Sequence, residues 1–195
     1  LAAAGLVLAE FEHETPRALH ERREPMFFNR LGLAIDQVEA DYDIVVIDCP
    51  PQLGFLTMSA LIAATTVLIT VIPSMLDIAS MNQFLQMTAG LLNVVASYGA
   101  SLEYDNLKFL ITRFEPSDGP QAQMAGFLRA LFAEQVMTNT FLKSTAVSDA
   151  GLTQQTLYEV DRSEFNRNTY DRAVESINQV SSELEGLVQA AWGRN

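Results

Sequence analysis

The sequence predicts an α/β domain in which helices cover both faces of a parallel β-sheet. Short β-branched runs alternate along the chain with longer segments of helical periodicity. The candidate strands are apolar at successive positions, which is typical of strands buried on both faces. Of the 195 residues, 49% are hydrophobic and 18% are charged, a globular composition. We therefore expect one domain over residues 1–195, with 1–25 as a connecting segment and 26–195 as the α/β body.

The elements follow from the local pattern in chain order. Residues 13–25 are charged and broken by prolines, so they predict either a mobile connection or a surface helix. The body is expected to contain an amphipathic helix over 27–42, a strand over 44–48, a helix over 53–64, a strand over 66–72, a helix over 76–98, a strand over 107–114, a helix over 121–136 and a closing helix over 164–192.

Charge and cysteine content restrict the function classes. The formal net charge of −12 argues against a protein that coats nucleic acid with its whole surface, although a local basic face remains open. A single cysteine, Cys49, excludes an internal disulfide and favours a reducing compartment. The first residues lack a basic region and turn acidic, so we read no signal peptide and expect a cytoplasmic protein.

The uncharged stretch over 53–72 is long enough to span a bilayer, and that alternative has to be weighed. No lysine or arginine occurs between Arg30 and Lys108, so the basic anchors expected beside a span are missing. The stretch also changes from helix-forming residues to a β-branched run that ends at Pro73. A helix followed by a buried strand is the better interpretation, and we expect no membrane partner.

Asp48 stands directly after the apolar run of residues 44–47. Ligands of parallel α/β sheets bind beyond the carboxyl ends of the strands, which would place Asp48, Pro73 and Thr112–Arg113 along one rim. A carboxylate there matches the Walker B arrangement, in which aspartate orders Mg²⁺ at nucleotide phosphates. A helix-capping carboxylate is the alternative. Two prolines then make a stiff loop, with a hinge at Gly54.

A phosphate-binding loop is not found in the sequence. The chain has two lysines, Lys108 and Lys143, and neither follows a glycine-rich loop. A nucleotide site would therefore be only partly contained in these residues.

Four segments carry a family resemblance. Residues 42–85, 111–124 and 142–173, with the terminal AWGR, resemble ParA-type partition ATPases, and most closely the RepA branch of repABC plasmids. The resemblance implies a P-loop NTPase fold of the deviant Walker type shared by ParA and MinD. Because no Walker A or A′ motif is present, the chain looks like the carboxyl-terminal half of such a protein, truncated at the N-terminus.

The resemblance implies ATP or ADP and Mg²⁺ as cofactors. Asp48 would hold Mg²⁺ through water and serve catalysis, and Cys49, Pro50 and Pro51 would form the switch that senses the γ-phosphate. Thr112 and Arg113 would contact the adenine, and Lys143 would lie in a second loop near the base. For Thr112–Arg113, a strand end with an ordinary surface arginine remains an equal alternative.

A group of basic side chains suggests a contact with DNA in addition to the nucleotide site. The resemblance implies that Lys143, Arg162, Arg167 and Arg172 bind DNA phosphates non-specifically in an ATP-bound homodimer. The alternative is a solvated helix face, since acidic residues are interleaved with the arginines. The apolar stripe of the closing helix lacks basic flanks between Arg172 and Arg194, so it should dock on its own domain.

The expected function is that of a plasmid-segregation ATPase. It would act at the bacterial nucleoid with a centromere-binding partner of the ParB/RepB type, and it would also bind an operator to repress its own operon. These residues by themselves would be inactive without the Walker A loop. The alternative is a non-enzymatic DNA- or partner-binding module on a degenerate ATPase fold.

Overall fold

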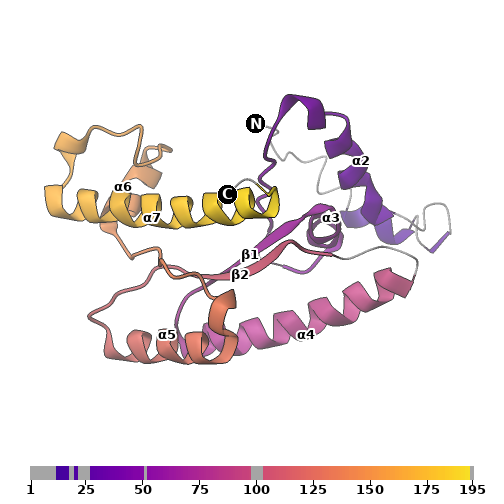
Figure 1. The fold of residues 1–195 in the computed structure, drawn as a ribbon, viewed down its shortest axis with the longest axis horizontal. Coiled ribbons are helices and arrows are strands. Elements are labelled where there is room, and N and C mark those ends of the chain that lie inside the picture. The colour runs from indigo at the N-terminus through magenta and orange to yellow at the C-terminus, as the bar shows by residue number, and fades with distance from the viewer. Residues whose placement is uncertain (1–11, 18–19, 22–26, 51, 98–102, 194–195) are drawn as a thin grey trace. The chain divides into compact units, whose positions relative to one another are not determined.

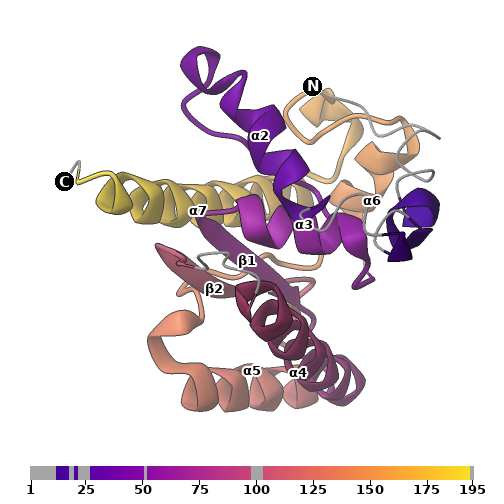
Figure 2. The ribbon, with the colours of Figure 1, turned by 90° about the vertical axis from the view of Figure 1, so that its right-hand side faces the viewer.

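The computed structural model describes residues 12–17, 20–21, 27–50, 52–97 and 103–193. The chain divides into two compact units, Leu1–Thr65 with Phe84–Tyr104, and Thr66–Gln83 with Asp105–Asn195. Figures 1 and 2 show the ribbon in two views. Most of the expected connecting segment lies outside the described residues. Its described part is helical over 12–17, which favours the surface-helix alternative there.

Short helices around an aromatic cluster form the first unit. The predicted helix over 27–42 is broken into a 3-10 turn (Phe27–Asn29), α2 (Arg30–Asp36) and a second 3-10 turn (Glu39–Asp41). Helix α3 (Phe55–Ala63) packs against the first turn, where the rings of Phe27 and Phe55 meet edge to face at 5.0 Å. Met58 and Val95 complete this buried cluster.

The predicted strand over 44–48 is wrong. These residues take part in no β-ladder, and Ile44, Val45 and Val46 are 53%, 45% and 88% exposed. A strand exists only when its N–H and C=O groups pair with a neighbour. Among the described residues no strand pairs with this segment, so its strand-forming sequence stays solvent-exposed.

Two parallel strands form the sheet of the second unit. β1 (Thr66–Val71) and β2 (Asn106–Ile111) pair in register from Thr66 opposite Asn106 to Val71 opposite Ile111. Helix α4 (Met75–Ser97) connects them, as parallel pairing requires a crossover. The strands predicted over 66–72 and 107–114 are thus confirmed, with the second ending three residues early.

Helices cover both faces of this sheet (Figures 1 and 2). Helix α7 (Arg167–Ala191) packs through Val180 on Leu110, whereas Phe132 of α5 (Gly119–Phe132) stacks at 4.4 Å on Phe109. Neighbouring residues of a strand face opposite sides, so α5 and α7 lie on opposite faces. The expected sandwich is confirmed in this unit, and the apolar stripe of α7 docks on its own domain as predicted.

Residues 136–143 run beside β2 as an irregular third strand. The amide of Met137 donates to the carbonyl of Phe109 at 2.9 Å, and the amide of Phe141 donates to that of Ile111 at 2.9 Å. Further on, Phe114 and Leu142 form a parallel bridge. The chain then enters α6 (Thr145–Leu152), a helix that the sequence did not predict. This pairing brings the loop after β2 next to the start of α6.

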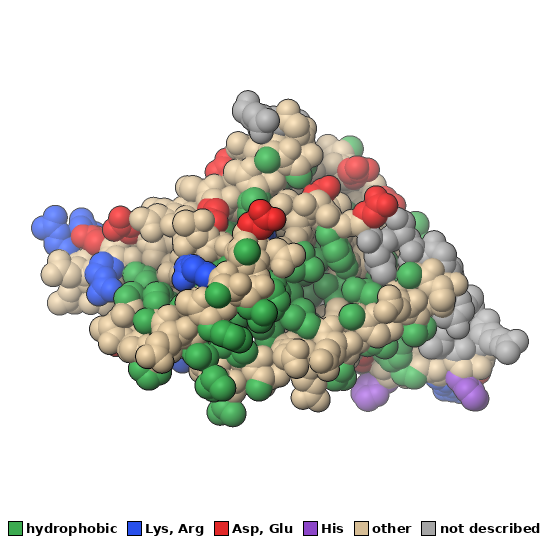
Figure 3. All heavy atoms as spheres, turned by 60° about the horizontal axis from the view of Figure 1, so that its bottom comes forward, with side chains coloured by type: hydrophobic (Ala, Val, Ile, Leu, Met, Phe, Trp, Pro, Cys, Tyr) green, Lys and Arg blue, Asp and Glu red, His purple; other side chains and the backbone are tan. Residues whose placement is uncertain are grey.

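Apolar side chains remain at the surface of the described residues. Figure 3 shows many of them on one face of the molecule, and several large ones on α4 and α5 are more than 45% exposed, namely Met75, Leu76, Met87, Val94, Phe127 and Leu131. Among the described helices, none is both long and apolar enough to cross a membrane.

Candidate functional site

The loop after residue 47 carries the candidate Mg²⁺ ligand in the first unit. Asp48 and Pro50 are exposed, and Pro51 lies outside the described residues. Desolvation, and to a smaller extent the charge of Asp48, raise the pKa of the Cys49 thiol, which keeps it neutral. In the described part of the chain, no group of three or more histidine, cysteine or acidic side chains could hold a metal ion. Asp48 thus belongs to no such group among the described residues, and its contact with Mg²⁺ stays a prediction.

The end of this loop is fixed on α3. The carboxylate of Glu12 accepts hydrogen bonds from the amides of Phe55 at 3.1 Å and Leu56 at 2.8 Å, and thereby caps the helix. Thr57 donates its hydroxyl proton to the carbonyl of Gln52 at 2.7 Å. The capping role weighed for Asp48 is thus performed by Glu12, a residue that sequence reasoning missed because it lies about forty positions away.

The structure shows a steric reason for glycine at position 54, and the hinge predicted there stays a prediction. The backbone angles of Gly54, φ −115° and ψ −172°, are open to any residue. A Cβ at this position would lie 2.6 Å from Oε1 of Glu12, so a side chain would displace the capping carboxylate. The glycine keeps room for the cap.

In the second unit, Thr112 and Arg113 follow β2. The Thr112 amide donates to the carbonyl of Val71 at 2.9 Å, which ties together the ends of the two strands. Arg113 is exposed and adopts φ +51°, an uncommon angle for a non-glycine residue. The strained backbone turns the chain toward Phe114, whose amide and carbonyl both bond to residues 141–143.

Lys143 lies beside this turn. Its ammonium group contacts Oε2 of Glu115 at 3.1 Å, and the Glu115 amide donates to Oε1 of Gln121 at 2.9 Å. The structure thus brings together Thr112, Arg113 and Lys143, three residues that the resemblance assigned near the base. Glu115 is an addition that the sequence pattern did not reveal, because its partner is 28 positions away.

The four candidate DNA-binding cations fall into two groups. Arg162 donates to the Asp171 carboxylate, and the Nε of Arg167 lies 3.9 Å from the same carboxylate. The hydrogen bond that Arg162 donates to Asp171, and then the charge of that carboxylate, raise the pKa of Arg162. Lys143 and Arg172 instead line one small cavity of about 30 Å³. The i,i+4 spacing of Arg167 and Asp171 is the signal by which the first group could have been found.

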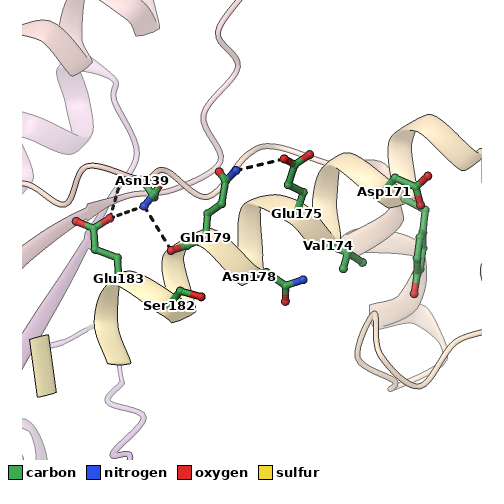
Figure 4. A pocket seen from close by; sticks show the side chains of 9 residues that line it. Asn139, Asp171, Val174, Glu175, Asn178, Gln179, Ser182 and Glu183 are labelled. Atoms are coloured by element: carbon green, nitrogen blue, oxygen red, sulfur yellow. Dashed lines mark hydrogen bonds between the residues drawn. The ribbon is translucent and has the colours of Figure 1, made fainter. Parts of the chain in front are cut away.

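A larger open groove of about 690 Å³ runs along α7 (Figure 4). Glu183 accepts hydrogen bonds there from the Asn139 side chain and from two backbone amides, and Gln179 donates to Glu175. Its ionisable lining side chains, apart from Tyr170, are the carboxylates of Asp171, Glu175 and Glu183. Carboxylates repel phosphates, so the groove is unsuited to a nucleotide.

Comparisons with known proteins agree with the sequence resemblance. The AAA domain family matches residues 2–97. A Rhizobium rhizogenes protein named replication protein A is 56% identical over all of this chain and 48% of its own length. One of the same name from Sinorhizobium fredii is 52% identical over the same shares. The chromosome partitioning protein ParA of Myxococcus xanthus is 33% identical over 55% of this chain and 36% of its own length.

The chain spans about half the length of the two rhizobial relatives. Their similarity extends over all of its residues, and the alignment with the partitioning protein covers 55% of the chain. The parallel strands with helices on both faces agree with the α/β fold of P-loop NTPases. The chain therefore belongs to the ParA-type family of P-loop ATPases, and it is similar over its whole length to rhizobial proteins named replication protein A.

Proposed function

We propose that this chain is part of a plasmid-partition ATPase that binds ATP with Mg²⁺, dimerises and binds DNA without sequence preference at the nucleoid. The whole protein responds to a centromere-binding partner of the ParB/RepB type, and it represses transcription of its own operon. The observation that carries the proposal is the whole-chain similarity to the rhizobial proteins, combined with Asp48 at the end of an apolar run. Because neither lysine follows a glycine-rich loop, the phosphate-binding loop has to come from residues outside this sequence.

Each residue has a role in this proposal. Asp48 is exposed and free to order Mg²⁺ through water, and the prolines after Cys49 stiffen the switch loop. Thr112 and Arg113 contact the adenine. The strained backbone turn at Arg113 supports this proposed contact, because a strained conformation persists only where surrounding contacts enforce it.

Asp48 offers the direct test. In a version of the protein that includes the phosphate-binding loop, Asp48→Ala should abolish Mg²⁺-dependent ATP turnover. Asp43→Ala, which removes another exposed acid five residues earlier, should leave turnover unchanged. Circular dichroism should be the same for both variants, since neither side chain is buried. Wild-type turnover in Asp48→Ala would remove this carboxylate from the site.

The 195 residues alone should not turn over ATP. Amides and lysines of a phosphate-binding loop supply most of the phosphate affinity in P-loop proteins, and the chain has no such loop sequence. Isothermal titration calorimetry with Mg-ATP should therefore give no measurable heat at micromolar concentrations. A micromolar dissociation constant for Mg-ATP would contradict the proposal that the phosphate-binding loop lies outside these 195 residues.

A non-enzymatic DNA- or partner-binding module is the second candidate. The absence of a glycine-rich lysine loop from the sequence favours it. The two proposals differ in one measurement: DNA binding by the longer protein should depend on ATP if it is an ATPase, and should be indifferent to ATP if it is a module.

A further inference from the structure

The irregular segment beside β2 contains a bulge. The amide of Met137 donates to the carbonyl of Phe109, and the amide of Phe141 donates to the carbonyl of Ile111. Between these two bonds the outer segment advances by four positions, from 137 to 141, while β2 advances by two, from 109 to 111. Paired strands of a regular ladder advance together. The outer segment therefore carries two extra residues, and residues 138–140 form the bulge.

A carboxylate of α7 binds the amides that the bulge removes from the ladder. Glu183 accepts hydrogen bonds from the amides of Thr138 at 2.7 Å and Asn139 at 2.8 Å, and from the side chain of Asn139 at 2.8 Å. Figure 4 shows Glu183 reaching from α7 toward Asn139. Because backbone amides need an acceptor when they leave a ladder, Glu183 takes the place of a pairing strand.

The residues after the bulge are also fixed, and one amide in the segment stays free. The buried hydroxyl of Ser176 on α7 accepts the amide proton of Leu142 at 3.4 Å, and the carbonyl of Phe114 accepts that of Lys143 at 2.9 Å. The Thr140 amide donates to no acceptor among the described residues. The last residue of the bulge thus keeps a backbone donor for a ligand.

The bulge lies at the edge of the sheet where the nucleotide base is proposed to bind. Thr112 and Arg113 directly follow Ile111, the residue whose carbonyl closes the bulge. Ligands of parallel sheets bind beyond the carboxyl ends of the strands, and bulges often occur beside active sites because they redirect a strand. Glu183 itself lines the acidic groove, which is unsuited to a nucleotide, so any effect on the base has to pass through the bulge.

We propose that Glu183 is a positioning residue for the nucleotide base: it holds the bulge so that the free amide of Thr140 donates to the adenine ring. This inference rests on the proposed ATP binding. N1 of adenine is an unprotonated acceptor, whereas N1 of guanine carries a hydrogen. A fixed backbone donor therefore favours ATP over GTP, because a site built for a hydrogen bond rejects an analogue that cannot make it.

The first test compares ATP and GTP turnover by a version of the protein that includes the phosphate-binding loop. In Glu183→Ala, the KM for ATP should rise about tenfold while kcat and the KM for GTP change less than about twofold, because lost base contacts weaken ground-state and transition-state binding alike. Glu183→Gln keeps one acceptor oxygen and should recover part of the preference for ATP. Glu175→Ala is the matched control, since Glu175 lines the same groove but binds only Gln179 of its own helix among the described residues.

The second test needs no nucleotide and uses the 195-residue chain. In Glu183→Ala, amide hydrogen exchange at Thr138 and Asn139 should become faster, since both amides lose their acceptor. The amide resonance of Thr140 should shift in nuclear magnetic resonance spectra, and neither change should occur in Glu175→Ala. An unmoved Thr140 resonance would show that Glu183 does not place this amide, and would overturn the inference.

The outcomes separate this inference from the proposed function. An ATP preference that survives in Glu183→Ala would overturn the positioning role and leave the proposed ATPase intact. An equal loss of turnover with ATP and GTP would mean a folding defect alone and would also overturn it. No ATP turnover in the unsubstituted longer protein would instead overturn the proposed function, and the inference with it.

Discussion

Residues 44–47 and residues 107–111 are both mainly apolar, yet only the second segment forms a strand. The first reads Ile-Val-Val-Ile and the second Leu-Lys-Phe-Leu-Ile, so both carry large apolar side chains. The second is the β2 strand, where Phe109 and Ile111 are 2% and 0% exposed. The first is unpaired, and Val46 is 88% exposed. The second segment has a strand to pair with and two helices that cover it, and the first has neither. Residues with a high strand propensity therefore form a strand only where a β-ladder and a covering layer are available.

Truncation of Ile111 should have the largest effect. Ile111→Ala should lower the free energy of unfolding by about 2–5 kcal/mol, because the side chain is fully buried in the sheet. Val46→Ala should change it by less than ~0.5 kcal/mol, because the side chain is already in water. Urea unfolding followed by circular dichroism measures both. Equal losses would mean that residues 44–47 are buried in solution and would remove the contrast.

The irregular third strand gives the next prediction. Glu183 on α7 accepts two backbone amides, of Thr138 at 2.7 Å and Asn139 at 2.8 Å, and so holds residues 138–139 beside β2. Glu183→Ala leaves both donors without this partner, so we expect a loss of about 1–3 kcal/mol in urea unfolding. Glu185→Ala, an exposed acid on the same helix, is the control and should have almost no effect.

A smaller effect is expected in the first unit. Gly54→Ala places a Cβ against the Glu12 carboxylate and should remove the cap of α3, at a cost of about 1 kcal/mol. Amide hydrogen exchange at Phe55 and Leu56 should become faster, and Glu12→Ala should produce the same pattern. Gly32→Ala, with open space around the added carbon, is the matched control. Unchanged exchange in Gly54→Ala would show that the cap is not formed in solution.

The smallest prediction concerns acid pH. The backbone amide and hydroxyl of Ser163 donate to Asp161 and hold the pKa of that carboxyl below its ordinary value. A lowered folded pKa means that the contribution is present above the unfolded value, about 3.9, and is lost as pH falls through the folded pKa. The Ser163 amide resonance should therefore move at a pH below about 3.9, and Asp161→Asn should abolish that movement. A midpoint at or above the ordinary value would contradict the hydrogen bonds.

Prediction of the site from sequence was partial for a physical reason. Asp48, Thr112 and Arg113 could be named because each follows a local apolar run. Glu12 and Glu115 could not, because each contacts a partner in a distant segment of the chain. No local pattern records which distant side chain arrives there.

By itself, the sequence determined the elements whose signal is local. The strands at 66–71 and 106–111 and the long helices α4, α5 and α7 follow from side-chain periodicity, since helical hydrogen bonds join residues four positions apart. The family resemblance is likewise a property of the linear order of residues. Only the tertiary structure decided that residues 44–47 stay outside the sheet, that residues 136–143 run beside β2, and that Lys143 and Arg172 line one cavity. Strand pairing and cavity lining join residues distant in sequence, and their formation depends on which partners the folded chain supplies.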